Sequence, residues 1–291
     1  MVVFFSLVGV WIVVNLLIAV VTSIWHWRWC RSVSWTAAGT LPSAVPIERG
    51  VGETAALFVH GFNDVPYVWT RIIDELVQKG VHCRALCLPG AGTSSCHPTL
   101  VSLRGAVDCE LAELRKRYAR VVLVGHSMGG ALAIDAVLRK TERSAFPDKL
   151  VLLAPLVEIS RARSPIFAPA VYYRLLRLLF PLLRWVPSVF REYLSAEDDD
   201  TFVYRRDRFN EIGWYAALFD LIASLRRANR RHLAVPTVVY VAGQDRVVDS
   251  EATRRWFGDL PCVQIVERPA SSHVVPLNVG WRDIVSEIAR V

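Results

Sequence analysis

Residues 121–138, VVLVGHSMGGALAIDAVL, decide the fold of this chain. Val121–Val124 is an apolar run rich in β-branched residues, which is typical of a buried strand. The segment Met128–Lys140 is rich in Ala and Leu and therefore predicts a helix. Between them, Gly125-His126-Ser127-Met128-Gly129 matches the pattern Gly-x-Ser-x-Gly. A strand, this turn and a helix in direct succession predict that Ser127 is a nucleophile exposed at the turn.

The spacing of this turn has a physical reason. A serine hydroxyl can project from a sharp strand-to-helix turn only where neighbouring backbone packs closely, and Gly125 and Gly129 leave room for it. The helix that follows directs its first N–H groups towards the oxyanion that forms when the hydroxyl attacks a carbonyl. The alternative is a glycine-rich turn with an incidental serine, and the flanking strand and helix argue against that alternative.

Strands and helices alternate along most of the chain on either side of this segment. The alternation, together with strands that are apolar throughout, predicts an α/β fold with a mostly parallel sheet and helices on both faces. The expected strands are Ala55–Val59, Val81–Leu88, Val121–Val124, Leu150–Leu153, Thr237–Ala242 and Val263–Val266, and the expected helices are Val68–Lys79, Leu100–Tyr118, Met128–Lys140, Glu251–Phe257 and Trp281–Arg290. We expect a linker at residues 28–53, a core formed by residues 54–155 and 235–291, and a helical cap at residues 156–234.

The expected cap interrupts the alternation of strands and helices. Its length marks it as an insertion, and most of it has little strand character. Tyr172–Leu194 is rich in aromatic residues and Leu, and its Arg residues are spaced to lie near one helical face, although Pro181 and Pro187 interrupt it. These are Arg174, Arg177, Arg184 and Arg191. The pattern fits a lid that touches a bilayer and admits an acyl chain, and it equally fits an amphipathic cap with a solvated Arg stripe.

Residues 1–27 predict a transmembrane anchor. Val2–Trp25 contains no charged residue and would reach roughly 36 Å as a helix, enough to cross the hydrocarbon core. A cleavable signal peptide is the alternative, but it would need a charged start, a shorter apolar stretch and a small-residue cleavage site. The run instead ends in Trp residues beside Arg28, a composition typical of a membrane interface. Arg28 and Arg31 follow the span, which predicts that the rest of the chain lies on the cytoplasmic side of the membrane.

Charge and cysteine content narrow the class of partner. The 291 residues carry a formal charge of +7, without a long Lys/Arg block of the kind that binds nucleic acid, so no nucleic-acid partner is expected. The excess Arg could face anionic lipid or could simply be solvated. No Cys pair has the C-x-x-C spacing of a zinc or redox site. Disulfides among Cys83, Cys87 and Cys96 are possible, but the sequence does not require them.

From about Ala55 to the C-terminus the chain resembles the α/β-hydrolase superfamily, and within it the monoacylglycerol-lipase-like and carboxylesterase-like members. The resemblance rests on Val59-His60-Gly61-Phe62, Leu88-Pro89-Gly90-Ala91-Gly92, the Ser127 turn, and an Asp and a His that follow in the family's order. It implies that the backbone N–H groups of Phe62 and Met128 bind the oxyanion. Ala91 stands where the family more often has His, but its loop contributes no catalytic residue. His60 is interpreted as a structural side chain that supports its loop.

A serine nucleophile needs a His as base and a carboxylate that orients the His. His273 is the last His of the chain and lies between the last expected strand and the last expected helix. The other histidines fit this role less well. Asp245 is the expected acid because it follows the strand Thr237–Ala242 through a short Gly-Gln turn. Asp249 is the alternative, although it fits better as the N-cap of the next helix.

These residues together predict carboxylic ester hydrolysis through an acyl-enzyme, with Ser127, Asp245 and His273 as the catalytic set. No metal and no organic cofactor are implied. The resemblance, the anchor and the apolar cap suggest a small acyl ester or lipid as the substrate, such as a monoacylglycerol or a lysolipid. A thioesterase or acyltransferase could use the same three residues. A non-catalytic, membrane-anchored binding module is a further alternative. The presence of all three catalytic residues argues against it, because a binding module does not need them.

Overall fold

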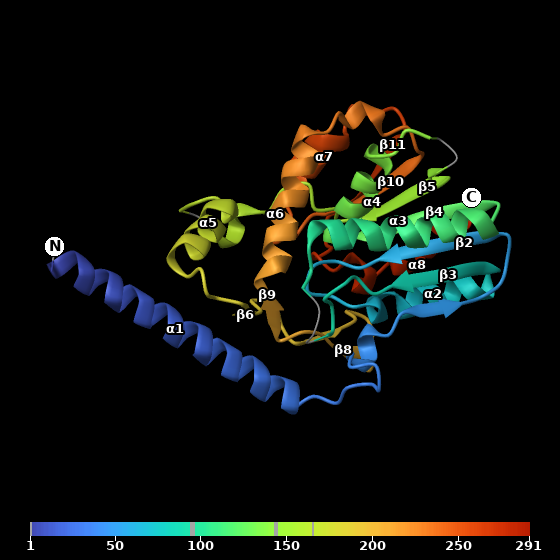
Figure 1. The fold of residues 1–291 in the computed structure, drawn as a ribbon. Helices are drawn as coiled ribbons and strands as arrows, with labels where there is room; N and C mark the ends of the chain where they lie inside the picture. The colour runs from blue at the N-terminus through green and yellow to red at the C-terminus, as the bar shows by residue number, and fades with distance from the viewer. Residues whose placement is uncertain (1, 94–96, 143–144, 165) are drawn as a thin grey trace.

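The computed structural model describes residues 2–93, 97–142, 145–164 and 166–291. A seven-stranded sheet lies at the centre of the molecule, with the strand order β1-β3-β2-β4-β5-β10-β11 (Figure 1). Every neighbouring pair is parallel except β1 with β3. The strands are β1 (Ile47–Arg49), β2 (Thr54–Val59), β3 (Val81–Leu86), β4 (Arg120–His126), β5 (Lys149–Leu153), β10 (Thr237–Ala242) and β11 (Val263–Arg268). The prediction of an α/β fold with a mostly parallel sheet is confirmed.

Helices cover both faces of the sheet. The buried side chains of α3, α4 and α6 pack against one face, and those of α2 and α8 pack against the other. The helices are α2 (Thr70–Gln78), α3 (Leu100–Arg117), α4 (Met128–Leu138), α6 (Ile212–Arg227), α7 (Ser250–Phe257) and α8 (Trp281–Ala289). Strands between two helical layers are buried on both sides, which explains why they are apolar throughout instead of alternating.

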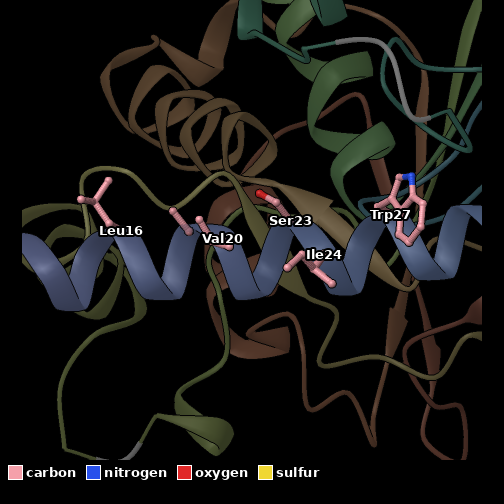
Figure 2. A pocket seen from close by; sticks show the side chains of 6 residues that line it. Leu16, Val20, Ser23, Ile24 and Trp27 are labelled. Carbon is pink, nitrogen blue, oxygen red and sulfur yellow. The ribbon is translucent and has the colours of Figure 1, made fainter.

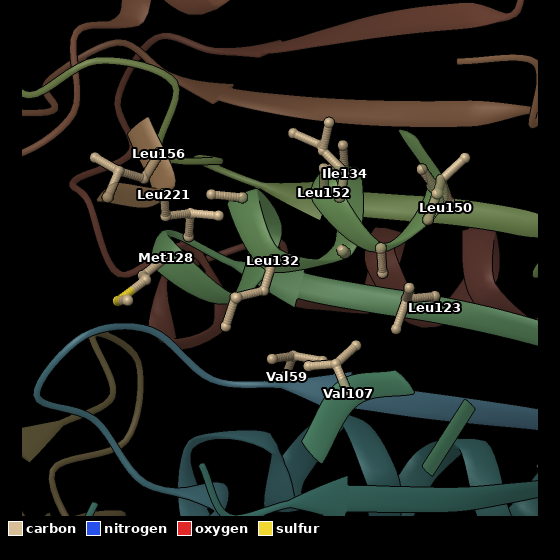
Figure 3. Close-up of a cluster of buried hydrophobic side chains, with 14 of the residues drawn as sticks. Val59, Val107, Leu123, Met128, Leu132, Ile134, Leu150, Leu152, Leu156 and Leu221 are labelled. Atoms are coloured by element: carbon tan, nitrogen blue, oxygen red, sulfur yellow. The ribbon is translucent and has the colours of Figure 1, made fainter. Parts of the chain in front are cut away.

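The core cluster on the α4 side holds the segment that carries Ser127. Figure 3 shows its side chains from β4, β5, α3, α4 and α6 in one contiguous group. The labelled members include Leu123, Met128, Leu132, Leu152 and Leu221. Burial of each such side chain stabilises the folded state by roughly 1.5–3 kcal/mol. The turn between β4 and α4 is therefore held from both ends by a close-packed core.

The insertion between β5 and β10 differs from the expected helical cap. Its described residues form two α-helices, α5 (Pro169–Leu179) and α6, together with four short strands. The strands form two small antiparallel pairs, β6 (Trp185–Pro187) with β9 (Phe209–Glu211) and β7 (Tyr193–Ser195) with β8 (Val203–Arg205). Three residues per strand give too short a pattern for period-2 alternation to be recognised in a sequence.

The predicted helical Arg stripe is also only partly present. Helix α5 ends at Leu179 and Phe180 leaves the helical conformation, because the next residue, Pro181, disfavours helical backbone before it. Arg184 lies beyond the helix, so it shares no helical face with Arg174 and Arg177. Helix α6 instead contributes to the core around the central sheet, since Trp214 and Leu221 on it are buried in the cluster around α4.

Helix α1 (Val2–Arg31) lies outside the core, beside β6 of the insertion (Figure 1). Its segment Ser6–Arg31 has a mean hydropathy of 2.5 and is long and apolar enough to cross a membrane. Length and composition fit either a membrane anchor or a signal sequence. The helix continues through Arg28 to Arg31, into the expected linker, which further on contains β1.

The cysteines described by the structure are free thiols. Cys83 and Cys87, which sequence spacing left as candidates for a disulfide, are not bonded to each other. Burial raises the pKa of each of these two thiols to about 12, so they remain protonated and unreactive near neutral pH. Cys96 lies outside the described residues.

Candidate active site

Ser127 occupies the single-residue turn between β4 and α4. Its φ of 54° and ψ of −118° lie outside the regions that non-glycine residues ordinarily adopt. Neighbouring backbone holds this conformation, because the Ser127 N–H donates to the Leu153 carbonyl at 3.0 Å and the Ser127 carbonyl accepts from Leu156 N–H at 2.9 Å. A strained backbone conformation of this kind persists only where many surrounding contacts hold it, and such residues are common at functional sites.

The two flanking glycines of the turn are required by close backbone contacts. A Cβ on Gly125 would lie 2.6 Å from the Gly129 carbonyl oxygen, and a Cβ on Gly129 would lie 2.2 Å from the Val59 carbonyl oxygen. No side chain fits at such distances without movement of the backbone. The sequence therefore keeps glycine at these positions so that β2 and the start of α4 can pack against the turn.

His273 and Asp245 lie beside Ser127, on loops that follow β11 and β10. The Ser127 hydroxyl donates to His273 Nε2 at 3.0 Å, and His273 Nδ1–H donates to Asp245 Oδ2 at 2.7 Å. All three residues follow parallel strands, whose carboxyl ends meet at one edge of the sheet. The structure thus brings together the serine, the histidine and the carboxylate that the sequence singled out, in hydrogen-bonding order.

The second oxygen of Asp245 is fixed by backbone. Its Oδ1 accepts the N–H groups of Val247 at 2.7 Å and Val248 at 2.9 Å. Burial alone would raise the pKa of Asp245, but the hydrogen bond from His273 and the two backbone donors outweigh it and lower the pKa below its usual range. Asp245 is therefore ionised near neutral pH and can hold His273 in one tautomer and orientation.

Asp249 has a different role in the structure. Its side chain accepts the Ala252 N–H at 2.9 Å and caps the N-terminus of α7. That contact is the one expected of a helix N-cap, and it leaves Asp245 as the carboxylate that contacts His273.

The loop after β2 lies against the serine turn. A Cβ on Gly61 would be only 3.1 Å from Ser127 Cβ, so the backbone of Gly61, directly before Phe62, borders Ser127. Met128 follows the serine directly and begins α4. The ring of Phe62 packs against the insertion, with its centroid 5.1 Å from Tyr215 and 5.9 Å from Trp214. The insertion thus covers the loop that the resemblance assigns to oxyanion binding.

Two buried histidines form hydrogen bonds to the backbone of the loops around Ser127. His60 Nδ1–H donates to the Gly61 carbonyl at 2.9 Å, and His60 Nε2 accepts the Leu88 N–H at 3.0 Å. His126 Nε2–H donates to the His273 carbonyl at 2.9 Å. Burial lowers the pKa of His60 to about 4 and that of His126 to about 3, so both rings are neutral. They act as fixed hydrogen-bonding groups that join the loops around Ser127.

A buried polar cluster beside these loops was not anticipated from the sequence. Tyr204 OH donates to Asp64 Oδ1 at 2.9 Å, and Asp64 Oδ2 lies 4.0 Å from His126 Nδ1. Asp207 accepts the Gly92 N–H at 2.7 Å. Burial raises the pKa of Asp64, and it raises that of Asp207 to about 7. Tyr204 and Asp207 belong to the insertion, so this cluster joins the insertion to the core next to the site.

The loop that carries His273 is braced from the same insertion. Asn278 Nδ2 donates to Ser272 Oγ at 3.0 Å and to Glu197 Oε1. The Glu197 N–H in turn donates to the Leu277 carbonyl at 2.9 Å. These contacts restrict the loop on either side of His273, which keeps its imidazole aligned with Ser127.

This arrangement can perform nucleophilic chemistry on an electrophilic carbon. The serine hydroxyl has a base within hydrogen-bonding distance, and the base has an orienting carboxylate. Among the residues that the structure describes, no group of three or more His, Cys, Asp or Glu side chains is placed to hold a metal ion.

Comparisons with known proteins agree with the fold. A phospholipase of Bacillus subtilis, YtpA, is 25% identical over 215 residues, which cover 69% of this chain and 79% of that protein. The crystal structure of a Paleococcus ferrophilus monoacylglycerol lipase superposes with a TM-score of 0.65 at 19% identity, covering 84% of this chain and 97% of the lipase. A soluble variant of the monoglyceride lipase of Saccharomyces cerevisiae gives a TM-score of 0.66 at 14% identity, covering 84% of this chain and 89% of that chain.

The family itself is shown by the sequence. Residues 56–283, most of the chain, match the pattern of the Alpha/beta hydrolase family. The match runs from β2 to the start of α8 and includes the serine turn and the loops of Asp245 and His273. This protein therefore belongs to the α/β-hydrolase family and is a lipase- and esterase-like member of it.

Proposed function

We propose that this protein hydrolyses carboxylic esters through an acyl-enzyme formed on Ser127. The observation that carries the proposal is the chain of hydrogen bonds from Ser127 Oγ to His273 Nε2, at 3.0 Å, and from His273 Nδ1 to Asp245 Oδ2, at 2.7 Å. Both distances fall within the range in which a base takes a proton from its nucleophile.

The proposed reaction has two halves. Ser127 Oγ attacks the ester carbonyl while His273 Nε2 takes its proton, and the oxyanion accepts hydrogen bonds from the backbone N–H groups of Phe62 and Met128. Collapse of this intermediate breaks the bond to the alcohol, which leaves with the proton from His273. Water then attacks the acyl-enzyme with His273 as base again, and the carboxylic acid is released. Asp245 stabilises the imidazolium in both halves without taking the proton.

The substrate we propose is an ester with an apolar acyl chain, such as a monoacylglycerol or a lysolipid. The aromatic rings of Tyr215 and Phe190 pack around Phe62, on the loop that borders Ser127 at Gly61, which suits an apolar group. Helix α1 supports attachment to a membrane, where such esters are found, with the rest of the chain on the cytoplasmic side. The names of the relatives, a phospholipase and monoacylglycerol lipases, point in the same direction.

A chain-length series tests the reaction and the substrate class together. Hydrolysis of aryl esters and monoacylglycerols with short to long acyl chains is measured for the wild-type protein and for Ser127→Ala. We expect turnover to rise with chain length and to fall at least about 10⁴-fold in Ser127→Ala, since a serine nucleophile and its base act as one unit.

Two other outcomes would decide against parts of this proposal. Full activity in Ser127→Ala would exclude Ser127 as the nucleophile. Turnover of acyl-thioesters alongside no hydrolysis of any oxygen ester would identify a thioesterase, which uses the same three residues on a different leaving group.

A further inference from the structure

Helix α1 has a docking face along one side. The side chains of Asn15, Thr22, His26 and Trp29 are 2%, 8%, 8% and 8% exposed, whereas most other side chains described on this helix are exposed. With Trp11 they are separated by three, four or seven residues, so they form one stripe along the helix. The stripe holds the most buried polar groups of α1, and it faces the insertion.

The first half of the stripe contacts the end of α5. Trp11 Nε1–H and the Asn15 side-chain amide both donate to the Leu179 carbonyl, each at 2.9 Å. The carbonyls in the last turn of a helix have no partner within the helix, so these donors cap α5. Asn15 Nδ2 also donates to the Trp11 carbonyl at 3.1 Å, which holds the amide in place.

The second half of the stripe contacts β6 and the loop that follows it in the insertion. The His26 ring stacks on Trp185 with a centroid distance of 3.5 Å and an interplanar angle of 8°. Trp29 Nε1–H donates to Glu192 Oε1 at 2.9 Å, and Glu192 is paired with Arg205. Thr22 donates to carbonyls of α1 itself, but Trp11, Asn15, His26 and Trp29 all have partners in the insertion, so α1 is docked on the cap.

This docking conflicts with a helix that crosses the bilayer. The Trp29 end must stay at or outside the membrane interface, because Trp29 is bonded to the Glu192–Arg205 ion pair. Asn15 would then lie about 21 Å deeper at 1.5 Å per residue, beyond the middle of a hydrocarbon core about 30 Å thick. Leu179 is bonded to Asn15, so the exposed Arg174 and Arg177 of α5 would be carried into hydrocarbon, where a guanidinium is strongly unfavourable.

The faces that remain exposed suit contact with a single leaflet. Leu16, Val20, Ile24 and Trp27 follow one another along α1, with Ser23 among them, and line a shallow apolar groove away from the docking stripe (Figure 2). Arg31 lies 4.8 Å from the Trp27 ring, a pairing typical of the headgroup level. Helix α5 and the residues after it add exposed apolar side chains next to α1, at Leu175, Leu178, Leu179 and Leu182.

We propose that α1 lies in the plane of the membrane, with its stripe on the cap and its outer face in the hydrocarbon of one leaflet. The N-terminus and the hydrolase core are then on the same side, in place of the crossing helix that the sequence predicts. The proposal rests on the membrane attachment included in the proposed function, and it does not depend on the chemistry of Ser127. It places the cap, which borders the nucleophile at Phe62, directly at the lipid surface.

Protease protection of two terminal tags tests this arrangement. The full chain carries one cleavable tag at each terminus and is reconstituted into vesicles of phosphatidylcholine with a minority of phosphatidylglycerol. Protease is added outside, and the tags lost by each molecule are determined from intact mass. An in-plane helix predicts molecules that lose both tags or neither, whichever way they were inserted. Molecules that lose only one of the two tags would show a crossing helix and overturn the proposal.

A pair of matched variants tests the contact with Leu179. Asn15→Leu removes the amide donor and makes the helix more apolar, so the share of molecules that lose only one tag should rise several-fold. Val14→Leu also introduces Leu, at a neighbouring exposed position that has no bond to Leu179, and should behave as the wild type. Equal tag loss in the two variants would show that the Leu179 contact does not hold α1 in place.

Hydrolysis of a soluble aryl ester, measured in detergent on the same preparations, separates this test from the proposed function. Wild-type activity with single-tag loss would overturn only the in-plane helix. Loss of both tags or neither, without any ester hydrolysis, would overturn only the proposed chemistry.

Discussion

Asp245 and Asp249 lie four residues apart on one loop, yet their oxygens have different partners. Asp245 contacts His273 and two backbone N–H groups, whereas Asp249 caps α7. The sequence favours Asp245, through its short turn after the strand, over Asp249, which fits a helix N-cap, but it does not show the contact with His273 itself. Side-chain direction within the loop decides this, and it depends on the turn that Val247 and Val248 make around Asp245 Oδ1.

Substitution of each carboxylate by its amide separates these two roles. Asp245→Asn should lower kcat/KM for an aryl ester by about 10⁴-fold, because the amide favours the wrong tautomer of His273. Asp249→Asn should retain nearly full activity and stability, since Asn is as good an N-cap as Asp. Steady-state kinetics with a thermal unfolding check measure both. A large loss of activity in Asp249→Asn with Asp245→Asn near wild type would reverse the assignment.

The buried Asp207 should make stability depend on pH. Burial raises its pKa to about 7, opposed in part by the Gly92 N–H and Arg206, whereas in the unfolded chain it ionises near 3.8. Between these values the unfolded chain loses its proton first, so the folded state loses stability as pH rises and the loss levels off above about pH 7. The loss could reach about 4 kcal/mol for a shift of this size.

Urea unfolding of Asp207→Asn between about pH 4 and 8 measures this effect. The variant should gain stability relative to wild type as pH rises, because its side chain stays neutral. Asp200→Asn, at an exposed carboxylate of the same insertion, should follow the wild-type curve. Parallel curves for wild type and Asp207→Asn would contradict the raised pKa.

At the scale of elements, the sequence predicted the hydrolase strands and helices closely and the insertion poorly. Long runs such as Thr237–Ala242 are buried on both faces, so their apolar composition alone identifies them. The contact between Asp64 and Tyr204 joins residues 140 positions apart, and no local pattern in the sequence reports it. After α5 the sequence shows the interruption at Pro181. It does not show the strands that follow, because three residues per strand are too few for a recognisable pattern.

The bond between Asp64 and Tyr204 should stabilise the junction of insertion and core. Tyr204→Phe removes one of the two donors that the described residues supply to the buried Asp64 Oδ1 and leaves the Val65 N–H, which should cost about 1–3 kcal/mol in the free energy of unfolding. Tyr193→Phe, on the paired strand but with an exposed ring, should change it by less than about 0.5 kcal/mol. Equal effects of the two substitutions in urea unfolding would contradict this account.

At the scale of the whole molecule, the insertion lies between Ser127 and the proposed membrane surface. It contacts the loop after β2 at Phe62, braces the His273 loop through Glu197, and carries the docked helix α1. The fold and the order of Ser127, Asp245 and His273 could be predicted because they depend on local patterns along the chain. The position of α1 could not, because an apolar helix of this length has the same sequence whether it crosses a membrane or lies on it.

The most direct test of the central claim is where a fluorophosphonate reacts. This reagent forms a stable adduct with an activated serine, and peptide mass mapping locates it. We expect one adduct per chain on the peptide that contains Ser127, with loss of esterase activity in proportion to labelling, and no adduct in Ser127→Ala. His273→Ala should label far more slowly, since the base is missing. Loss of activity with the adduct on a different residue, or full activity in a protein labelled completely at Ser127, would contradict the claim that Ser127 is the nucleophile.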